Sequence, residues 1–600
     1  MQATTAIPHP AVHEAEHEEF GFWSKYVFST DHKIIGIQYG VTALFFLLFG
    51  FFLMLMMRWQ IAHPGQAIPL VGSLLEKALG DPAKEGKMSN DLYNSFGAMH
   101  GTIMVFMAIV PLAFAAFGNF VVPLQIGAPD MAFPRVNMAS YQAYVIGALI
   151  MFVSFFIPGG AAQAGWTSYS PLATAVPTNG QTFWILGMVC LITSSLLGAV
   201  NFIATIIQLR APGMTWMRLP FFVWAQFVTA FLLLLAFPPL EAAAVLQLMD
   251  KVAHTSFFLP TGLAVGGNLA NVSGGGSPLL WQHLFWFLGH PEVYVLILPA
   301  MGIVAEIIAN NTRKPIWGYK SLVYSVLTIG FLSFIVWAHH MYLTGMGTRV
   351  ATFFQTTTMI ISIPSVIILT CMFLSLWGGS IRFTVPMLFV MAFLPMFGIG
   401  GLTGLPLGFN YSDLHLHDTY YVIAHFHYIV APGTIFALFA GIYYWFPKIT
   451  GRMMNDFWGK VHFWGSLIFM NLIFQPMFAQ GMAGMLRRMA DGGLNYSQAQ
   501  VPGAIGGLSA QIIGLHKYIL WAAVALALVQ IPFIINLLWS INNGTKVTSD
   551  NPWGATTLEW QAPTPPPHGN FAKTPEVHRG PYEYSVPGHP TDFTPQNEPD

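Results

Sequence analysis

The feature that most constrains this chain is a succession of twelve apolar runs, each near the roughly 20 residues that an α-helix needs to cross a bilayer. Only 8% of the residues are charged, against roughly 25% in an ordinary soluble domain. A helix satisfies its backbone hydrogen bonds internally, so the pattern predicts an all-α integral membrane protein, a twelve-transmembrane-helix bundle. The runs lie at 35–58, 95–123, 140–158, 182–208, 218–246, 281–309, 317–341, 352–378, 383–405, 419–446, 459–484 and 514–541.

The chain divides into three expected parts. These are an N-terminal tail over 1–34, a twelve-helix membrane domain over 35–541, and a Pro-rich, polar C-terminal tail over 542–600, which we expect to be extended. An even number of spans places both termini on one side. The connections on that side carry more Lys and Arg than the opposite ones, which predicts that both termini are cytoplasmic. We expect a multi-pass protein of a bacterial cytoplasmic (inner) membrane.

Net charge and cysteine count exclude some partners and sites. The net charge of −1 gives no reason to expect nucleic acid as a partner. The two cysteines, Cys190 and Cys371, both lie in apolar runs. We therefore expect neither a disulfide framework nor a cysteine metal site.

Two histidines in the tenth run are the first candidate ligands. His425 and His427 are at positions i and i+2, which on an α-helix separates their side chains by roughly 200°. They point to opposite sides of the helix, so each could ligate a different centre. The alternative is a pair of core histidines bonded to neighbouring helices, because imidazoles in hydrocarbon are normally paired, bonded or metal-bound.

A second group of polar residues lies in the sixth and seventh runs. His290 and Tyr294 are i,i+4 and share one helix face. Glu292 is an ionisable group deep in an apolar run, which is a functional hypothesis by default. Neutral imidazoles suit copper, iron or zinc, and His290 with His339 and His340 could form a trigonal metal site. The alternative is that His339 and His340 only reach the membrane interface.

These motifs resemble the catalytic subunit of the haem-copper oxidases. The matching stretches are 286–294, 339–340 and 417–427, and they occur in the family's order on the corresponding spans. The resemblance runs from the Ser29–Lys33 stretch to the Gly484–Arg488 stretch. Within that family, the sequence most resembles subunit I of the A-type cytochrome c oxidases.

The resemblance implies two haems, taken as haem A, and one copper ion. The matching ligands are His100 and His427 for the low-spin haem iron, His425 for the high-spin haem iron, and His290, His339 and His340 for copper. It also implies a covalent link between Tyr294 and His290. Catalytic roles then fall to Tyr294, as a source of an electron and a proton, and to Glu292.

Further residues match positions near the outer surface. The resemblance assigns His417 and Asp418 to a magnesium or manganese ion, Arg487, Arg488 and Trp166 to haem propionates, and Arg58 to the low-spin haem periphery. From the sequence alone, His417 and Asp418 could instead form a hydrogen-bonded turn, and Arg487 and Arg488 could be a pair on the surface. Trp166 could be an ordinary interfacial tryptophan, and Arg58 could be an arginine that snorkels to the membrane interface.

The resemblance also implies a D-type proton pathway that begins at Asp130 and ends at Glu292. The residues that match its lining are Asn119, Asn137, Tyr39, Asn201, Ser194 and Ser195. Individually, such small polar residues are more often helix-packing groups. The family's second, lysine-containing pathway is interrupted, because Ile368 stands at the lysine position while Thr358 and Tyr294 remain.

The expected function is that of a respiratory terminal oxidase. It would oxidise cytochrome c, reduce O₂ to water and pump protons. No cysteine pair here could bind a dinuclear copper centre, so we expect that centre in a partner subunit. The expected partners are oxidase subunits II and III, cytochrome c or a fused cytochrome c domain, membrane lipid, and a larger respiratory assembly.

Three alternative functions stay open at this point. A quinol oxidase is disfavoured because Phe49, Leu53, Leu92 and Ser95 occupy the positions of a polar quinone site. A nitric oxide reductase is disfavoured by Tyr294 and Glu292, although the missing lysine leaves it open. A transporter with histidine proton relays would also suit twelve spans, and it would show no haem absorption.

Overall fold

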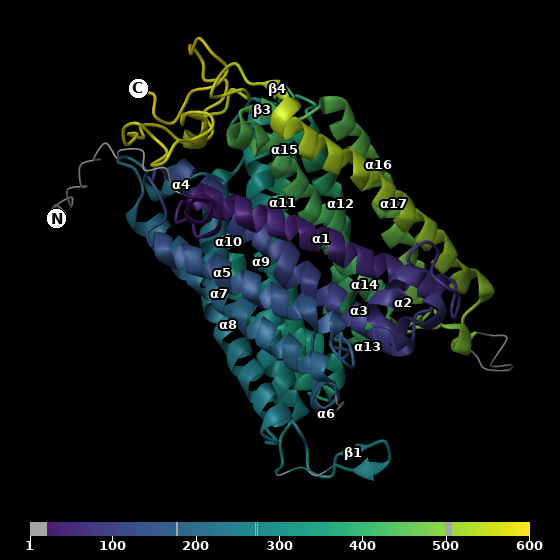
Figure 1. Cartoon of the computed structure of the whole chain (residues 1–600). Helices are drawn as coiled ribbons and strands as arrows, with labels where there is room; N and C mark the ends of the chain where they lie inside the picture. Colours follow the sequence, from purple (N-terminus) through teal and green to yellow (C-terminus); the bar gives the residue numbers. More distant parts are fainter. Residues whose placement is uncertain (1–20, 176–177, 271, 273, 498–506, 600) are drawn as a thin grey trace.

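The computed structural model describes residues 21–175, 178–270, 272, 274–497 and 507–599. Within this part of the chain, twelve helices are long and apolar enough to cross a membrane, which confirms the predicted bundle (Figure 1). The uninterrupted ones are α1 (His32–Ala62), α5 (Pro134–Val153), α7 (Asn179–Gln208), α8 (Phe221–Val252), α9 (Pro278–Thr312), α11 (Thr348–Leu376), α12 (Val385–Gly408), α16 (Asp456–Met482) and α17 (Ala510–Asn543).

The remaining three spans change helix type along their length. The second span joins α3 (Asn90–Thr102) to α4 (Phe117–Ile126) through π-helical turns at Ile103–Ile109 and Pro111–Ala116. The seventh span consists of α10 (Tyr319–Leu332) followed by 3₁₀ turns at Ser333–Ile335 and Trp337–Thr344. The tenth span joins α14 (Tyr420–Ile429) to α15 (Phe436–Thr450) through a π-helical turn at Val430–Ile435. Pro111 and Pro432 lack the N–H that a regular helix would use there. Such turns are frequent at functional sites, and these spans carry most of the predicted histidine ligands.

Burial places the second and sixth spans at the centre of the bundle. In each, 89% of the most apolar stretch is buried, against 33% in the first, eighth and twelfth spans. A helix that is apolar on every side is stable only where neighbours surround it. The histidines on the second and sixth spans therefore lie in the interior.

Short elements cap the two ends of the bundle. One end, here called the hairpin end, carries α2 (Gly72–Leu79), α6 (Leu172–Ala175), α13 (Asn410–Leu416) and a hairpin of β1 (Ala264–Val265) and β2 (Asn268–Leu269), with Ala264 opposite Leu269. The other, the tail end, carries β3 (Arg452–Met453) paired with β4 (Thr545–Lys546). The third span ends in a 3₁₀ turn at Ser154–Phe156 that directly follows α5. Isolated turns lie at Trp23–Val27, Asp81–Gly86, Trp216–Arg218, Leu494–Tyr496 and Leu558–Trp560.

The C-terminal tail is not extended as its composition predicts. It folds over the tail end of the bundle (Figure 1), and Trp560 and Tyr582 are buried there. The Tyr582 hydroxyl donates to Glu306 Oε1 at 2.6 Å, and Arg313 pairs with Asp592 at 2.5 Å. Aromatic residues spaced between the prolines supply apolar surface that binds the tail to the helix ends.

Candidate functional site

Three imidazoles converge in the middle of the bundle. His290 lies on α9, and His339 and His340 lie on the 3₁₀ stretch after α10. His340 Nε2 is 3.3 Å from His290 Nδ1 and 3.1 Å from His339 Nε2. Among the described residues, no other three ligand atoms of His, Cys, Asp or Glu lie so close together. Nitrogen ligands about 2.0 Å from one ion would have similar spacings, so this cluster fits the predicted copper ion.

Contacts behind the imidazoles set which nitrogen can bind a metal. The Thr358 hydroxyl donates to the Phe354 carbonyl at 2.5 Å, so its oxygen accepts from His339 Nδ1–H at 2.8 Å. His339 Nε2 is left with its lone pair toward the cluster. Such outer contacts fix ring orientation in metal sites. Trp286 stacks on His340 with ring centroids 3.9 Å apart.

Tyr294 and Glu292 lie beside the cluster on α9. The rings of Tyr294 and His290 have centroids 5.0 Å apart at 64°, as expected for one helix face. Glu292 is 1% exposed, and both of its carboxyl oxygens lack a hydrogen-bond partner within the described part of the chain. A carboxyl group without a fixed partner can turn to exchange protons on either side.

The three candidate haem ligands share one arrangement. In each, Nδ1 contacts a backbone carbonyl, at 2.8 Å for His100, 2.9 Å for His425 and 2.8 Å for His427. A carbonyl can only accept, so Nδ1 carries the hydrogen and Nε2 is the free ligand atom. This is the arrangement that orients metal-binding imidazoles, and it fits axial ligation of haem iron.

His425 and His427 point to opposite sides of α14, as their spacing predicts. His425 contacts the Gly400 carbonyl on α12, whereas His427 stacks on Phe474 of α16 at 4.5 Å between centroids. A Cβ atom on Gly404 would lie 2.7 Å from His425 Cε1, so the close approach of α12 requires glycine there. His100 is near enough to His427 for electrostatic interaction. The histidines thus divide into two sites.

Arg58 is buried without an anionic partner. It is 7% exposed, its Nη1 has no hydrogen-bond partner among the described residues, and its guanidinium lies 5.6 Å from the Tyr420 ring centroid. Burying an unpaired charge is costly. An acceptor group at the edge of a bound haem would satisfy this arginine, so the site fits its predicted role.

The two predicted propionate arginines differ in their surroundings. Arg487 pairs with Asp418 at 2.5 Å. Arg488 lies against Gly165, where a Cβ atom would be 2.9 Å from its Nη1. Trp166 follows directly and packs against Gly101, where a Cβ atom would be 2.9 Å from the Trp166 Cβ. Two glycines therefore make room for the side chains predicted to face the haem propionates.

His417 and Asp418 lie close to each other at the hairpin end. His417 Nε2 is 3.9 Å from Asp418 Oδ2, and His417 Nδ1 is 3.2 Å from Asp413 Oδ2. Burial acts to raise the pKa of Asp418, but Arg487 and His417 outweigh it and lower the pKa below its usual value. The carboxylate therefore stays ionised, which suits a hard divalent cation.

The predicted proton pathway begins at the tail end. Asp130 Oδ1 accepts from the Met131 N–H at 2.6 Å, and burial raises the pKa of Asp130. Further in, Asn137 Nδ2 donates to Asn119 Oδ1 at 2.7 Å. Asn201 is instead held by the backbone of Phe133, through bonds of 2.9 and 3.2 Å. It anchors the loop after Asp130.

A small polar cavity follows the asparagine pair. It encloses about 20 Å³ of space for water centres, enough to hold one water molecule. Tyr39 Oη lies 3.1 Å from both Ser140 Oγ and Ser194 Oγ. The polar side chains that line the cavity are those of Tyr39, Asn119, Ser140, Tyr144, Ser194 and Ser195. Ser140 is absent from the sequence prediction, although its i,i+3 spacing from Asn137 on α5 is a signal for it.

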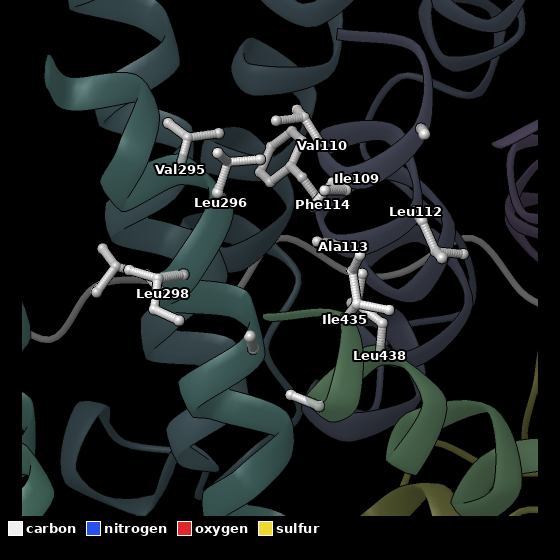
Figure 2. Packing of buried hydrophobic residues seen from close by; sticks show 14 of the residues in the cluster. Ile109, Val110, Leu112, Ala113, Phe114, Val295, Leu296, Leu298, Ile435 and Leu438 are labelled. Carbon is white, nitrogen blue, oxygen red and sulfur yellow. The ribbon is translucent and has the colours of Figure 1, made fainter. Parts of the chain in front are cut away.

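Apolar packing separates this cavity from α9. Val110 and Phe114 line the cavity, and Figure 2 shows them next to Leu296. Among the described residues, no chain of side-chain hydrogen bonds joins Ser195 to Glu292, so a proton would need water across this gap. Ile368 is fully buried on α11 and offers no polar atom for a second route.

Comparisons with known proteins identify the family of this chain. Residues 34–541 match the sequence model of the family described as cytochrome c and quinol oxidase polypeptide I. The chain is 44% identical to the alternative cytochrome c oxidase subunit 1 of Bradyrhizobium diazoefficiens, which covers 96% of this chain and 94% of that protein. It is 41% identical to the cytochrome c oxidase subunit 1 of Thermostichus vulcanus, covering 95% of each chain.

A solved structure of a haem-copper terminal oxidase dimer has the same fold. Its TM-score is 0.67 at 20% sequence identity, and the match covers 86% of this chain and 85% of that one. Family model, relatives and fold agree over nearly the whole length. The chain therefore belongs to the cytochrome c and quinol oxidase polypeptide I family, the subunit I family of the haem-copper oxidases.

Proposed function

We propose that this protein is the catalytic subunit of a respiratory terminal oxidase that oxidises cytochrome c, reduces O₂ to water and pumps protons. The observation that carries the proposal is the convergence of His290, His339 and His340 next to Tyr294 in the bundle core. The relatives named cytochrome c oxidase subunit 1 support the electron donor. Family membership also argues against a transporter without haem.

The histidines divide between two haems and one copper ion. His100 and His427 would hold the low-spin haem and His425 the high-spin haem, both taken as haem A, while the trio holds copper. When bound, these groups supply the redox chemistry of oxygen reduction. Tyr294 can hold a proton at its hydroxyl beside His290, and the i,i+4 spacing permits the covalent link that the family resemblance implies.

Protons would reach the site from the tail end, which we take as the cytoplasmic side of a bacterial inner membrane. Asp130 would take up the proton, the Asn119–Asn137 pair and the Tyr39 cavity would pass it inward through water, and Glu292 would deliver it. Ile368 blocks a lysine pathway, so Tyr294 would receive its protons by another route.

Electrons and supporting groups would come from the hairpin end. A dinuclear copper centre in a partner subunit II would pass electrons from cytochrome c, or from a fused cytochrome c domain, to this subunit. Subunit III and a larger respiratory assembly are the further proposed partners. His417 and Asp418 would share a magnesium or manganese ion, because their 3.9 Å separation lets both contact one cation.

Oxygen uptake by the purified complex with reduced cytochrome c tests the proposal, with visible spectra recorded alongside. Fast uptake and two spectrally distinct haems are expected. Two haems with uptake driven only by a quinol would transfer the assignment to a quinol oxidase. Two haems with nitric oxide consumption and no oxygen uptake would transfer it to a nitric oxide reductase, and absence of haem would overturn the proposal.

A further inference from the structure

One tail residue, Asn570, is bound inside the mouth of the proposed proton pathway. Its side chain is completely buried, although it lies in an irregular segment far along the chain. Asn570 Oδ1 accepts from Lys33 Nζ at 3.0 Å. Asn570 Nδ2 donates to the Ala128 carbonyl at 2.8 Å. His32 Nε2 lies 2.9 Å from Asn570 Nδ2 and 3.0 Å from Asn570 Oδ1.

These contacts use all the hydrogen-bonding groups of the Asn570 amide. His32 Nδ1 is 2.6 Å from the Asn119 carbonyl, which can only accept, so Nδ1 carries the hydrogen. His32 Nε2 is therefore the acceptor for Asn570. One amide hydrogen goes to His32, the other to Ala128, and the oxygen to Lys33, so the side chain is satisfied on every side.

The groups that Asn570 joins surround Asp130. Ala128 precedes Asp130 by two residues in the loop between α4 and α5, and His32 links the tail to the backbone of Asn119, which holds Asn137. The charged and titratable groups that face this region are Asp31, His32, Lys33, Asp130 and His568. A continuous bonded connection thus runs from the tail to the asparagine pair.

The backbone conformation at Asn570 also indicates that the side-chain contacts hold this residue in place. Its φ is +67°, a left-handed conformation that few residues other than glycine and asparagine adopt readily. Such conformations persist where the surroundings hold them in place. A glycine could keep this backbone while removing only the side-chain contacts.

We propose that Asn570 is a positioning residue for proton uptake. Through Asn570, the folded C-terminal tail holds the Asp130 loop and the Asn119–Asn137 pair in their relative positions at the mouth of the pathway. The proposal rests on the proposed function, because it assigns the tail a role in that same pathway. The tail then contributes to proton uptake, because it holds the Asp130 loop in place from outside the membrane domain.

The test is the substitution Asn570→Gly in the full complex, with proton uptake followed by a pH-sensitive dye after the reduced enzyme meets oxygen. Misplacement by about 1 Å can slow a reaction by about 100-fold, and we expect slowing of up to about this size. Haem spectra and the KM for cytochrome c should be unchanged, because those sites are remote from the tail.

Asn551→Gly is the matched control. Asn551 lies in the same tail and exchanges two bonds of 2.8 Å with Ala555, but it contacts no pathway residue. It should leave proton uptake at the wild-type rate. If Asn570→Gly fails to assemble, Asn570→Asp keeps the acceptor for Lys33 but loses the donors to His32 and Ala128, and it should also slow proton uptake.

The Asp130→Asn variant distinguishes a failure of the proposed proton pathway from a failure of the proposed positioning role of Asn570. Slow uptake in Asp130→Asn with a wild-type rate in an assembled Asn570→Gly complex would overturn the positioning role alone. Wild-type uptake in Asp130→Asn would overturn the pathway itself. Equal slowing by Asn551→Gly and Asn570→Gly would show that general loosening of the tail is responsible, which also contradicts a specific role for Asn570.

Discussion

Replacing Thr358 by valine should weaken copper binding without touching a ligand. The hydroxyl of Thr358 accepts the Nδ1–H of His339 at 2.8 Å, and valine has nearly the same shape but no acceptor. An N–H left without a partner in the protein interior costs about 1–3 kcal/mol. At about 1.4 kcal/mol per factor of ten, copper affinity should fall about 5- to 150-fold.

The assay is the copper content of the purified Thr358→Val complex after dialysis against a graded chelator, together with oxygen uptake and haem spectra. Thr357→Val is the matched control. The Thr357 hydroxyl contacts only the carbonyls of Phe353 and Phe354 at 3.2 and 3.1 Å in its own helix. Full copper retention in Thr358→Val at chelator levels that the wild type tolerates would refute the orienting role of this hydroxyl.

Three other substitutions test separate parts of the site. Glu292→Gln should nearly abolish oxygen uptake because an amide cannot deliver a proton, and wild-type turnover would contradict that role. Gly404→Ala should lower high-spin haem content, because its Cβ would lie 2.7 Å from His425 Cε1, whereas Gly401→Ala has open space and should not. Burial acts to raise the pKa of Asp31, but the electrostatic effects of His32 and Lys33 and the hydrogen bonds with Lys33 and His568 outweigh it and hold the pKa at about 2 instead of 3.8. Its charge thus contributes about 2 kcal/mol above pH ~4, which is lost as pH falls toward 2. Asp31→Asn keeps the helix cap and should lower the thermal denaturation midpoint at pH 7 but not at pH 2; equal midpoints at pH 7 would contradict this.

Local patterns in the chain were enough to predict the spans and the ligand faces. An apolar run of bilayer length has few options other than a helix, and the i,i+2 spacing of His425 and His427 requires opposite faces on any helix. The i,i+4 spacing of His290 and Tyr294 brings their rings together for the same reason. The pairing of these ligands into specific haem and copper sites came from family resemblance, since no local rule says which helices meet.

The residue pattern alone predicts the number of spans, their approximate positions and the side on which each histidine projects, because helix periodicity is a property of neighbouring residues. The return of the polar tail, the place of Ser140 in the cavity and the contact of Thr358 with His339 appear only in the folded chain. Asn570 and His32 are 538 positions apart in the chain. Their hydrogen bond depends on how distant helices pack and where an irregular tail is covered, and no local pattern encodes such a contact.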